Sequence, residues 1–214
     1  MMSPTPAGRH HLDQLRQALQ SFDACADVAH RWGGLLAATF ERGGRLLAAG
    51  NGGSAAQGQH LTAELVGRYR LERGPVSAIC LSAETSSLTA IINDYPPAEL
   101  FARQVEAHGR AGDVVALFST SGTSSNVVAA ARRARDLGLV VLAFTGPRPN
   151  ELADIADEAL CVDASYTATV QELHLVAMHI VCAAVDEAFG LPSRRDAAHD
   201  VTTRNDETLA VTRA

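Results

Sequence analysis

Five short apolar segments constrain the fold of this 214-residue chain more than any other feature, because none of them alternates between apolar and polar residues. A strand that is buried on both faces is a continuous apolar run, whereas a strand with one face in water alternates. Helix-like segments separate the five runs, as in chains of parallel strands. We therefore expect a three-layer α/β sandwich with a parallel five-stranded sheet, of flavodoxin-like type. The runs are residues 45–50, 76–81, 113–119, 140–146 and 158–163.

Helices are expected on both sides of these strands and before them. Helical periodicity predicts helices at 54–67, 97–108, 124–137 and 167–189, and glycines follow the last two. From about residue 11 to residue 42 the periodicity predicts an amphipathic helix, broken near Gly33 and Gly34. This helix is longer than one small domain needs, so we expect part of it to bury against another subunit. The predicted organisation is a flexible lead at 1–10, a single domain at 11–190 and a polar tail at 191–214.

Charge and cysteine usage narrow the class of protein. A formal net charge of −6 argues against non-specific nucleic-acid binding, which needs a basic face. The first residues lack the apolar core of a signal peptide, and no apolar run reaches membrane-spanning length. We therefore expect a cytoplasmic protein with no nucleic-acid or membrane partner. The four cysteines include no CxxC pair, which favours buried, reduced thiols.

Polar loops follow three of the predicted strands, at the carboxyl edge where parallel sheets bind ligands. The first loop, GNGGS at 50–54, offers glycines and free amides at a helix start, which suit an anion. A tight turn with a serine cap is the alternative. The second loop, STSGTSSN at 119–126, carries six hydroxyl side chains around Gly122. One hydroxyl would cap the following helix, but six exceed that need and indicate a phosphate site. The third loop is TGPRPN.

Two predicted helices carry side chains suited to metal binding or acid–base chemistry. His60 and Glu64 stand one turn apart, so both lie on one helix face. Gln171 and His179 are eight residues apart, a rise of about 12 Å, so they meet a common point only from opposite sides. A structural role is the alternative for both pairs, and Glu172 and His174 are alternative ligands.

Taken together, these stretches resemble the sugar isomerase (SIS) domain family, and more narrowly its phosphoheptose isomerases, over roughly residues 12–189. The resemblance implies that Glu64 and His179 are the catalytic base and acid. It implies one zinc ion per subunit, and a homotetramer with active sites shared between subunits. The implied zinc ligands are His60, Glu64, Gln171 and His179. The implied substrate contacts are Asn51, Gly52, Gly53, Ser54, Glu64, Asn93, Asp94, Ser119, Thr120, Ser121, Ser124 and Gln171. The motifs that carry the resemblance are GNGGSAAQGQHLTAELVGRYR, IINDYPPAELFARQVEAHGRAGDV, STSGTSSNV, TG and VQELHLVAMHI.

By this resemblance we expect an aldose–ketose isomerase. It would convert sedoheptulose 7-phosphate to D-glycero-D-manno-heptose 7-phosphate through an enediol(ate), the first step of nucleotide-activated heptose synthesis. One alternative is a non-catalytic SIS relative that binds the bacterial replication initiator, but that relative lacks counterparts of Glu64 and His179. The other alternative is an isomerase for a different sugar phosphate in specialised metabolism. Two departures from the family pattern bear on the expected substrate and activity. Ala168 and Thr169 stand where members often carry a polar pair, and the loop after the fourth strand is GPRPNE.

Overall fold

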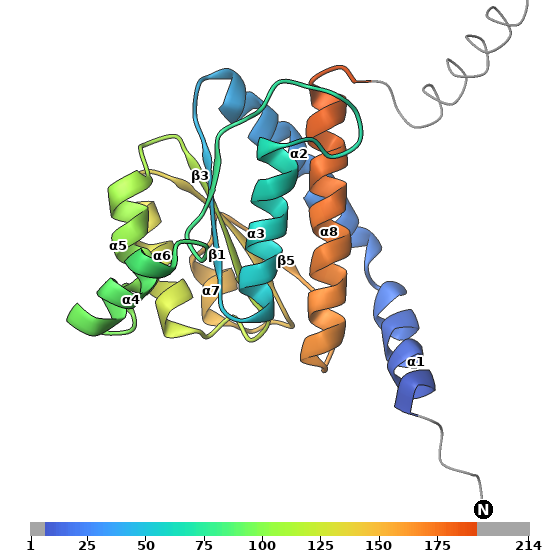
Figure 1. Ribbon diagram of the computed structural model, residues 1–214. Coiled ribbons are helices and arrows are strands. Elements are labelled where there is room, and N and C mark those ends of the chain that lie inside the picture. Colours follow the sequence, from blue (N-terminus) through green and yellow to red (C-terminus); the bar gives the residue numbers. More distant parts are fainter. Residues whose placement is uncertain (1–6, 192–214) are drawn as a thin grey trace, which may run out of the picture.

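The computed structural model describes residues 7–191 as a parallel five-stranded sheet between two layers of helices (Figure 1). The strand order is β2-β1-β3-β4-β5, and every neighbouring pair is parallel. This is the flavodoxin-type order, so the predicted fold class is confirmed. The strands are β1 (Leu46–Gly50), β2 (Ala78–Cys80), β3 (Val114–Ser119), β4 (Val140–Thr145) and β5 (Glu158–Cys161).

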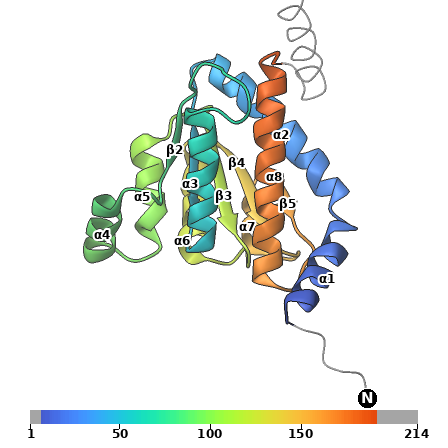
Figure 2. The ribbon, with the colours of Figure 1, turned by 45° about the vertical axis from the view of Figure 1, so that its right-hand side comes forward.

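Both faces of the sheet are covered, which is why its strands carry no polar alternation. On one face, Phe118 and Phe144 stack with ring centroids 4.2 Å apart, and Trp32 meets Phe144 edge-on at 5.0 Å. On the other face, strand residues such as Leu117 pack with Phe101 in a second core. The first face is covered by α2 (Asp23–Glu41), α3 (Gly53–Val66) and α8 (Thr167–Ala188). The second is covered by α5 (Glu99–His108), α6 (Ser125–Asp136) and α7 (Glu151–Ile155), and α4 (Thr85–Asp94) lies outside α5 (Figure 2).

The N-terminal region differs from the single helix that was expected. It forms α1 (Ala7–Leu19) and α2, which are separated at residues 20–22, so the predicted break at Gly33 and Gly34 is wrong. Gly33 is instead a point of close packing, because a Cβ there would lie 2.2 Å from the Cβ of Ala184 on α8. Helix α1 already begins at Ala7, within the expected lead. The rest of that lead and nearly all of the expected tail lie outside the described residues.

Helix α8 corrects a second expectation, that no apolar run reaches membrane-spanning length. Its 22 residues are long and apolar enough to cross a membrane, with a mean hydropathy of 1.5 over the most apolar window. However, 56% of that window is buried inside the fold, as in the core helix of a soluble protein. Burial also raises the pKa of the Cys182 thiol on this helix to about 12, and all four cysteines are free, as expected.

Candidate active site

The two glycine- and hydroxyl-rich loops lie side by side at the carboxyl edge of the sheet. One follows β1 and the other follows β3, the neighbouring strands between which the order reverses. Sheets of this type bind ligands at that switch point. Asn51 and Asn126 tie the loops together through two reciprocal side-chain hydrogen bonds of 2.9 and 2.8 Å. The predicted convergence of the loops is therefore confirmed.

Glycines in the first loop make room for a neighbouring helix. Gly52 has φ +54°, a conformation that L side chains rarely adopt, and it is the N-cap residue of α3. A Cβ on Gly53 would lie 2.7 Å from Nε2 of Gln171, so the glycine leaves room for the Gln171 side chain in this position. Gln57 Nε2 also donates a 2.5 Å hydrogen bond to the Gln171 carbonyl. The start of α3 and the start of α8 therefore meet at this loop.

The second loop leaves the start of α6 without a side-chain cap. Ser124 is the N-cap residue, but its hydroxyl makes no bond to the helix and lies 3.2 Å from the buried Ser119 hydroxyl. The expectation that one hydroxyl caps this helix is therefore wrong. Thr120 is half-buried and Ser121 is exposed, so hydroxyls of both kinds line the loop. Uncapped amides and hydroxyls together can bind a phosphate without a basic side chain.

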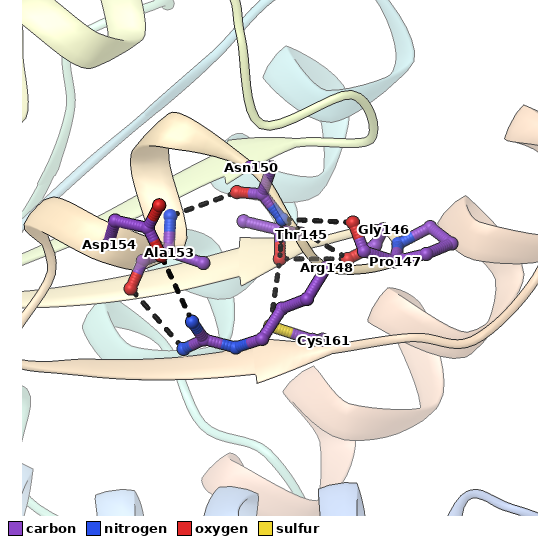
Figure 3. Close-up of polar contacts among 8 residues, drawn as sticks. All are labelled: Thr145, Gly146, Pro147, Arg148, Asn150, Ala153, Asp154 and Cys161. Atoms are coloured by element: carbon purple, nitrogen blue, oxygen red, sulfur yellow. Dashed lines mark hydrogen bonds and ion pairs between the residues drawn. The ribbon is translucent and has the colours of Figure 1, made fainter.

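The loop after β4 braces the hydroxyl-rich loop, and Figure 3 shows the polar contacts within and around this β4 loop. Asn150 Nδ2 donates to Thr145 Oγ1 at 3.2 Å, and Asn150 Oδ1 accepts from the Ala153 amide at 2.9 Å. A Cβ on Gly122, which has φ +63°, would lie 2.0 Å from Asn150 Oδ1. The two loops also bond directly, because the amide of Gly146 donates to the Thr120 carbonyl at 3.1 Å. The GPRPNE segment therefore supports the hydroxyl-rich loop.

A second cluster, the triad of His60, Glu64 and His179, forms where α3 packs against α8. One ligand atom from each of the three lies within 4.8 Å of the others, and His60 Nε2 lies 3.0 Å from Glu64 Oε1. The rings of His60 and His179 meet edge-on, with centroids 5.2 Å apart. Two imidazoles and a carboxylate are donors that zinc accepts, and three protein ligands leave a position for water or substrate. The residues present therefore fit the metal that the resemblance implies.

The electrostatics of the triad favour a neutral imidazole at His179. Burial lowers the pKa of His179 below its ordinary value of 6.5, and the neighbouring His60 lowers it as well. Glu64 raises this pKa and Arg70 lowers it, both to a smaller extent. A histidine must be neutral to bind a metal, so this environment suits ligation.

The structure does not bring all predicted site residues into one place. Gln171 lies against Gly53, and the eight-residue spacing puts it about 12 Å of helix rise from His179. Asn93 and Asp94 end α4 on the far side of the molecule from α8, where both are exposed (Figures 1 and 2). A single chain therefore presents the triad, the two loops with Gln171, and the end of α4 as separate groups.

The two alternative ligands on α8 have other roles. His174 is fully buried, and its Nε2 donates to the Thr145 carbonyl at 3.0 Å. Glu172 Oε1 lies 2.7 Å from His11 on α1. Neither residue belongs to the metal-compatible cluster.

Sequence reasoning missed several residues that shape these groups. Asn126 and Asn150 lie in motifs that were noted, but their bonds join segments that are distant in sequence. Tyr69 lies in the quoted GRYR stretch, and its ring stacks on His179. No periodicity or spacing signals such a contact, because it depends on how the loop after α3 folds back.

Comparisons with known proteins agree with this geometry. The sequence pattern of the SIS domain family matches residues 10–146. A phosphoheptose isomerase from Streptomyces coelicolor is 63% identical over 178 residues, which are 83% of this chain and 77% of that protein. One from Helicobacter pylori strain P12 is 44% identical over 84% of this chain and 92% of that protein. The solved phosphoheptose isomerase of Neisseria gonorrhoeae superimposes with a TM-score of 0.75 at 35% identity, covering 84% of this chain and 96% of that one.

These matches cover most of the chain, and their identities are well above the level at which only the fold is shared. They show that the proteins are related in sequence as well as in fold. The GNGGS loop follows β1 and the STSGTSSN loop follows β3. The triad residues lie on α3 and α8, which belong to the same fold. The chain therefore belongs to the SIS domain family and, within it, to the phosphoheptose isomerase type of enzyme.

Proposed function

We propose that this sugar-phosphate isomerase converts sedoheptulose 7-phosphate to D-glycero-D-manno-heptose 7-phosphate, the first step of nucleotide-activated heptose synthesis. The observation that carries the proposal is the meeting of His60, Glu64 and His179 within one chain. The relatives named phosphoheptose isomerase support the choice of sugar. We also expect the enzyme to act in the cytoplasm, without a nucleic-acid or membrane partner.

In this proposal Glu64 and His179 move the protons. Glu64 takes a proton from C1 of the ketose while the N–H group of the neutral His179 imidazole donates one to the carbonyl oxygen at C2, which produces an enediol. Glu64 then returns its proton to C2, and His179 recovers a proton from the hydroxyl at C1, which leaves the aldose. His60, Glu64 and His179 would hold a zinc ion. When bound, zinc supplies Lewis-acid polarisation of oxygen.

The phosphate would bind at the sheet edge. Ser119, Thr120, Ser121 and Ser124 offer hydroxyls there, and the start of α6 offers amides. Asn51, Gly52, Gly53, Ser54 and Gln171 would contact the sugar from the neighbouring loop. His60 follows Gly53 by seven residues, a rise of about 10 Å along α3. An extended seven-carbon chain with its phosphate at one end suits two recognition groups that are this far apart.

The direct test is to incubate the purified protein with sedoheptulose 7-phosphate and follow aldose formation by NMR. Glu64→Gln should lower kcat by at least about 10²-fold, the usual contribution of a general base. Glu72→Gln is the matched control, because the Glu72 side chain is 89% exposed. Turnover of a ketohexose phosphate in preference to the heptulose would favour the alternative substrate. A wild type that turns over neither would favour the non-catalytic reading.

The metal has its own test. Protein purified without chelator should hold about one zinc ion per chain, and His60→Ala should lose it. His30→Ala is the control, because His30 is an exposed histidine whose contact is with Glu187, outside the triad. Equal zinc contents in the His60 and His30 variants would exclude this site.

We further propose a homotetramer in which α4 of one copy completes the site of another. Helix α4 has no buried residue, although it carries Leu88, Ile91 and Ile92, and its end holds the predicted contacts Asn93 and Asp94. Association would bury these apolar side chains at about 25 cal/mol per Å². The triad comes from one chain, so its three side chains need no partner subunit to meet.

This arrangement predicts which inactive variants rescue one another. After dissociation and reassembly, a mixture of Glu64→Gln and Asp94→Ala should regain partial activity, because some sites combine an intact triad with an intact α4. A mixture of Glu64→Gln and His179→Ala should stay inactive, since each triad then carries one defect. A monomer by light scattering, or no rescue in verified mixed oligomers of the first pair, would contradict shared sites.

A further inference from the structure

We propose that Tyr69 is a positioning residue that holds the His179 imidazole in its place in the triad and thereby sets the zinc affinity of the site. The proposal rests on the metal site of the proposed function. Tyr69 lies in the segment that connects α3 to β2, whereas His179 lies on α8, more than a hundred residues later in the chain. The contact between them is therefore made only in the folded protein.

The two rings are stacked. Their centroids are 5.7 Å apart and their planes are inclined by 23°, within the range of offset-stacked aromatic pairs. The guanidinium carbon of Arg70 lies 4.8 Å from the centroid of the Tyr69 ring. The His179 ring thus has two ring neighbours, with His60 at its edge and Tyr69 stacked on it.

A buried ion pair keeps this segment in place. The side chains of Arg73 and Asp186 are only 4% and 10% exposed, and Arg73 Nε donates to Asp186 Oδ1 at 3.0 Å. The same guanidinium donates to the carbonyls of Glu64 and Leu65, at 2.8 Å each. These carbonyls belong to the last turn of α3, and the last carbonyls of a helix have no N–H donor within the helix itself. The Arg73 side chain therefore links its own segment, which carries Tyr69, to the end of α3 and to helix α8.

The consequence for the triad follows from the exposure of its members. His179 is only half-buried, so the neighbouring rings must restrict its side-chain rotations. A ligand that is already ordered loses less freedom when it binds a metal. Groups that orient metal ligands from outside the ligand set typically change metal affinity by about 10- to 100-fold. The Tyr69 hydroxyl has no hydrogen-bond partner among the described residues, so the ring alone carries the effect.

The test compares the zinc dissociation constants of wild type, Tyr69→Ala, Tyr69→Phe and Tyr95→Ala by competition with a chromogenic chelator. Tyr69→Ala should raise the constant by about 10-fold or more, and Tyr69→Phe should restore it to within about twofold of wild type. Tyr95→Ala is the matched control, since Tyr95 is 41% exposed and contacts Arg103 instead. Near-ultraviolet circular dichroism and thermal unfolding should show that all four proteins fold.

A second readout needs no metal. In the metal-free protein, NMR should show ring-current-shifted His179 ring protons, and the shift should disappear in Tyr69→Ala but not in Tyr69→Phe. An unchanged zinc affinity in a folded Tyr69→Ala protein would overturn the proposal, and so would equal loss in the Phe variant. If the wild type binds no zinc, the proposed metal site fails, and the NMR comparison alone then decides whether Tyr69 orders His179.

Discussion

His174 should make the stability of this protein depend on pH below neutrality. The imidazole is fully buried edge-on to the stacked rings of Phe118 and Phe144, with ring centroids 6.2 and 5.8 Å away. Burial lowers its pKa from the ordinary value of 6.5 to about 4, although the hydrogen bond to the Thr145 carbonyl opposes this shift. Nδ1 has no hydrogen-bond partner within residues 7–191, so a second proton on the ring would be buried there without an acceptor.

The sign and the size of the effect follow from proton linkage. Between the two pKa values the unfolded chain binds a proton at His174 and the native chain does not. Lowering the pH therefore favours unfolding, by about 1.4 kcal/mol per pH unit within this window. The full loss is about 3 kcal/mol, and it is complete once the pH falls below the native pKa. Above pH 6.5 this histidine contributes no pH dependence.

The assay is urea unfolding of wild type and His174→Gln at a series of pH values from neutral to the native pKa, at one protein concentration. Glutamine keeps an N–H group that can donate to the Thr145 carbonyl, but it does not titrate. The variant should be less stable at neutral pH, and the difference should shrink by about 3 kcal/mol as the pH falls. Parallel stability curves for the two proteins would refute the reasoning, because the other titrating groups are common to both.

Three further outcomes test packing and the loops. Gly33→Ala should lower the free energy of unfolding by about 1–3 kcal/mol, because its Cβ would clash with Ala184, whereas Gly34→Ala, with nothing within 4 Å, should be neutral or stabilising. Asp113→Ala should cost about 2–3 kcal/mol by urea unfolding, since the buried carboxylate accepts two backbone amides at 3.0 Å each. Asn126→Ala should raise KM for the sugar phosphate more than it lowers kcat, because the pair with Asn51 is lost. An unchanged KM in steady-state assays would separate this pair from substrate binding.

The architecture was accessible from the sequence because it depends on local patterns. Continuous apolar runs report burial on both faces, and β1, β3 and β4 lie within one residue of the predicted bounds. Gly138 and Gly190 end their helices with φ +76° and +74°, as the sequence suggested. The loops after β1 and β3 were placed together because parallel strands share a carboxyl edge. The triad residues were named from their motifs and their resemblance to a known family.

Other features depend on contacts between distant segments, which no local pattern encodes. The sequence pattern predicts that Gly33 breaks a helix, yet this glycine lies inside α2, where α2 and α8 approach too closely for a side chain. The length and apolarity of α8 are compatible with a membrane or a core, and only its burial against the sheet distinguishes them. Gln171 and His179 share a motif, but the rise of the helix separates them. Because α3 packs parallel to α8, Gly53 lies beside Gln171 and His60 lies beside His179. The distance between two residues of a helix is thus fixed by their spacing in the sequence, because the rise per residue is constant. Which residues of other segments contact each turn is decided by tertiary packing.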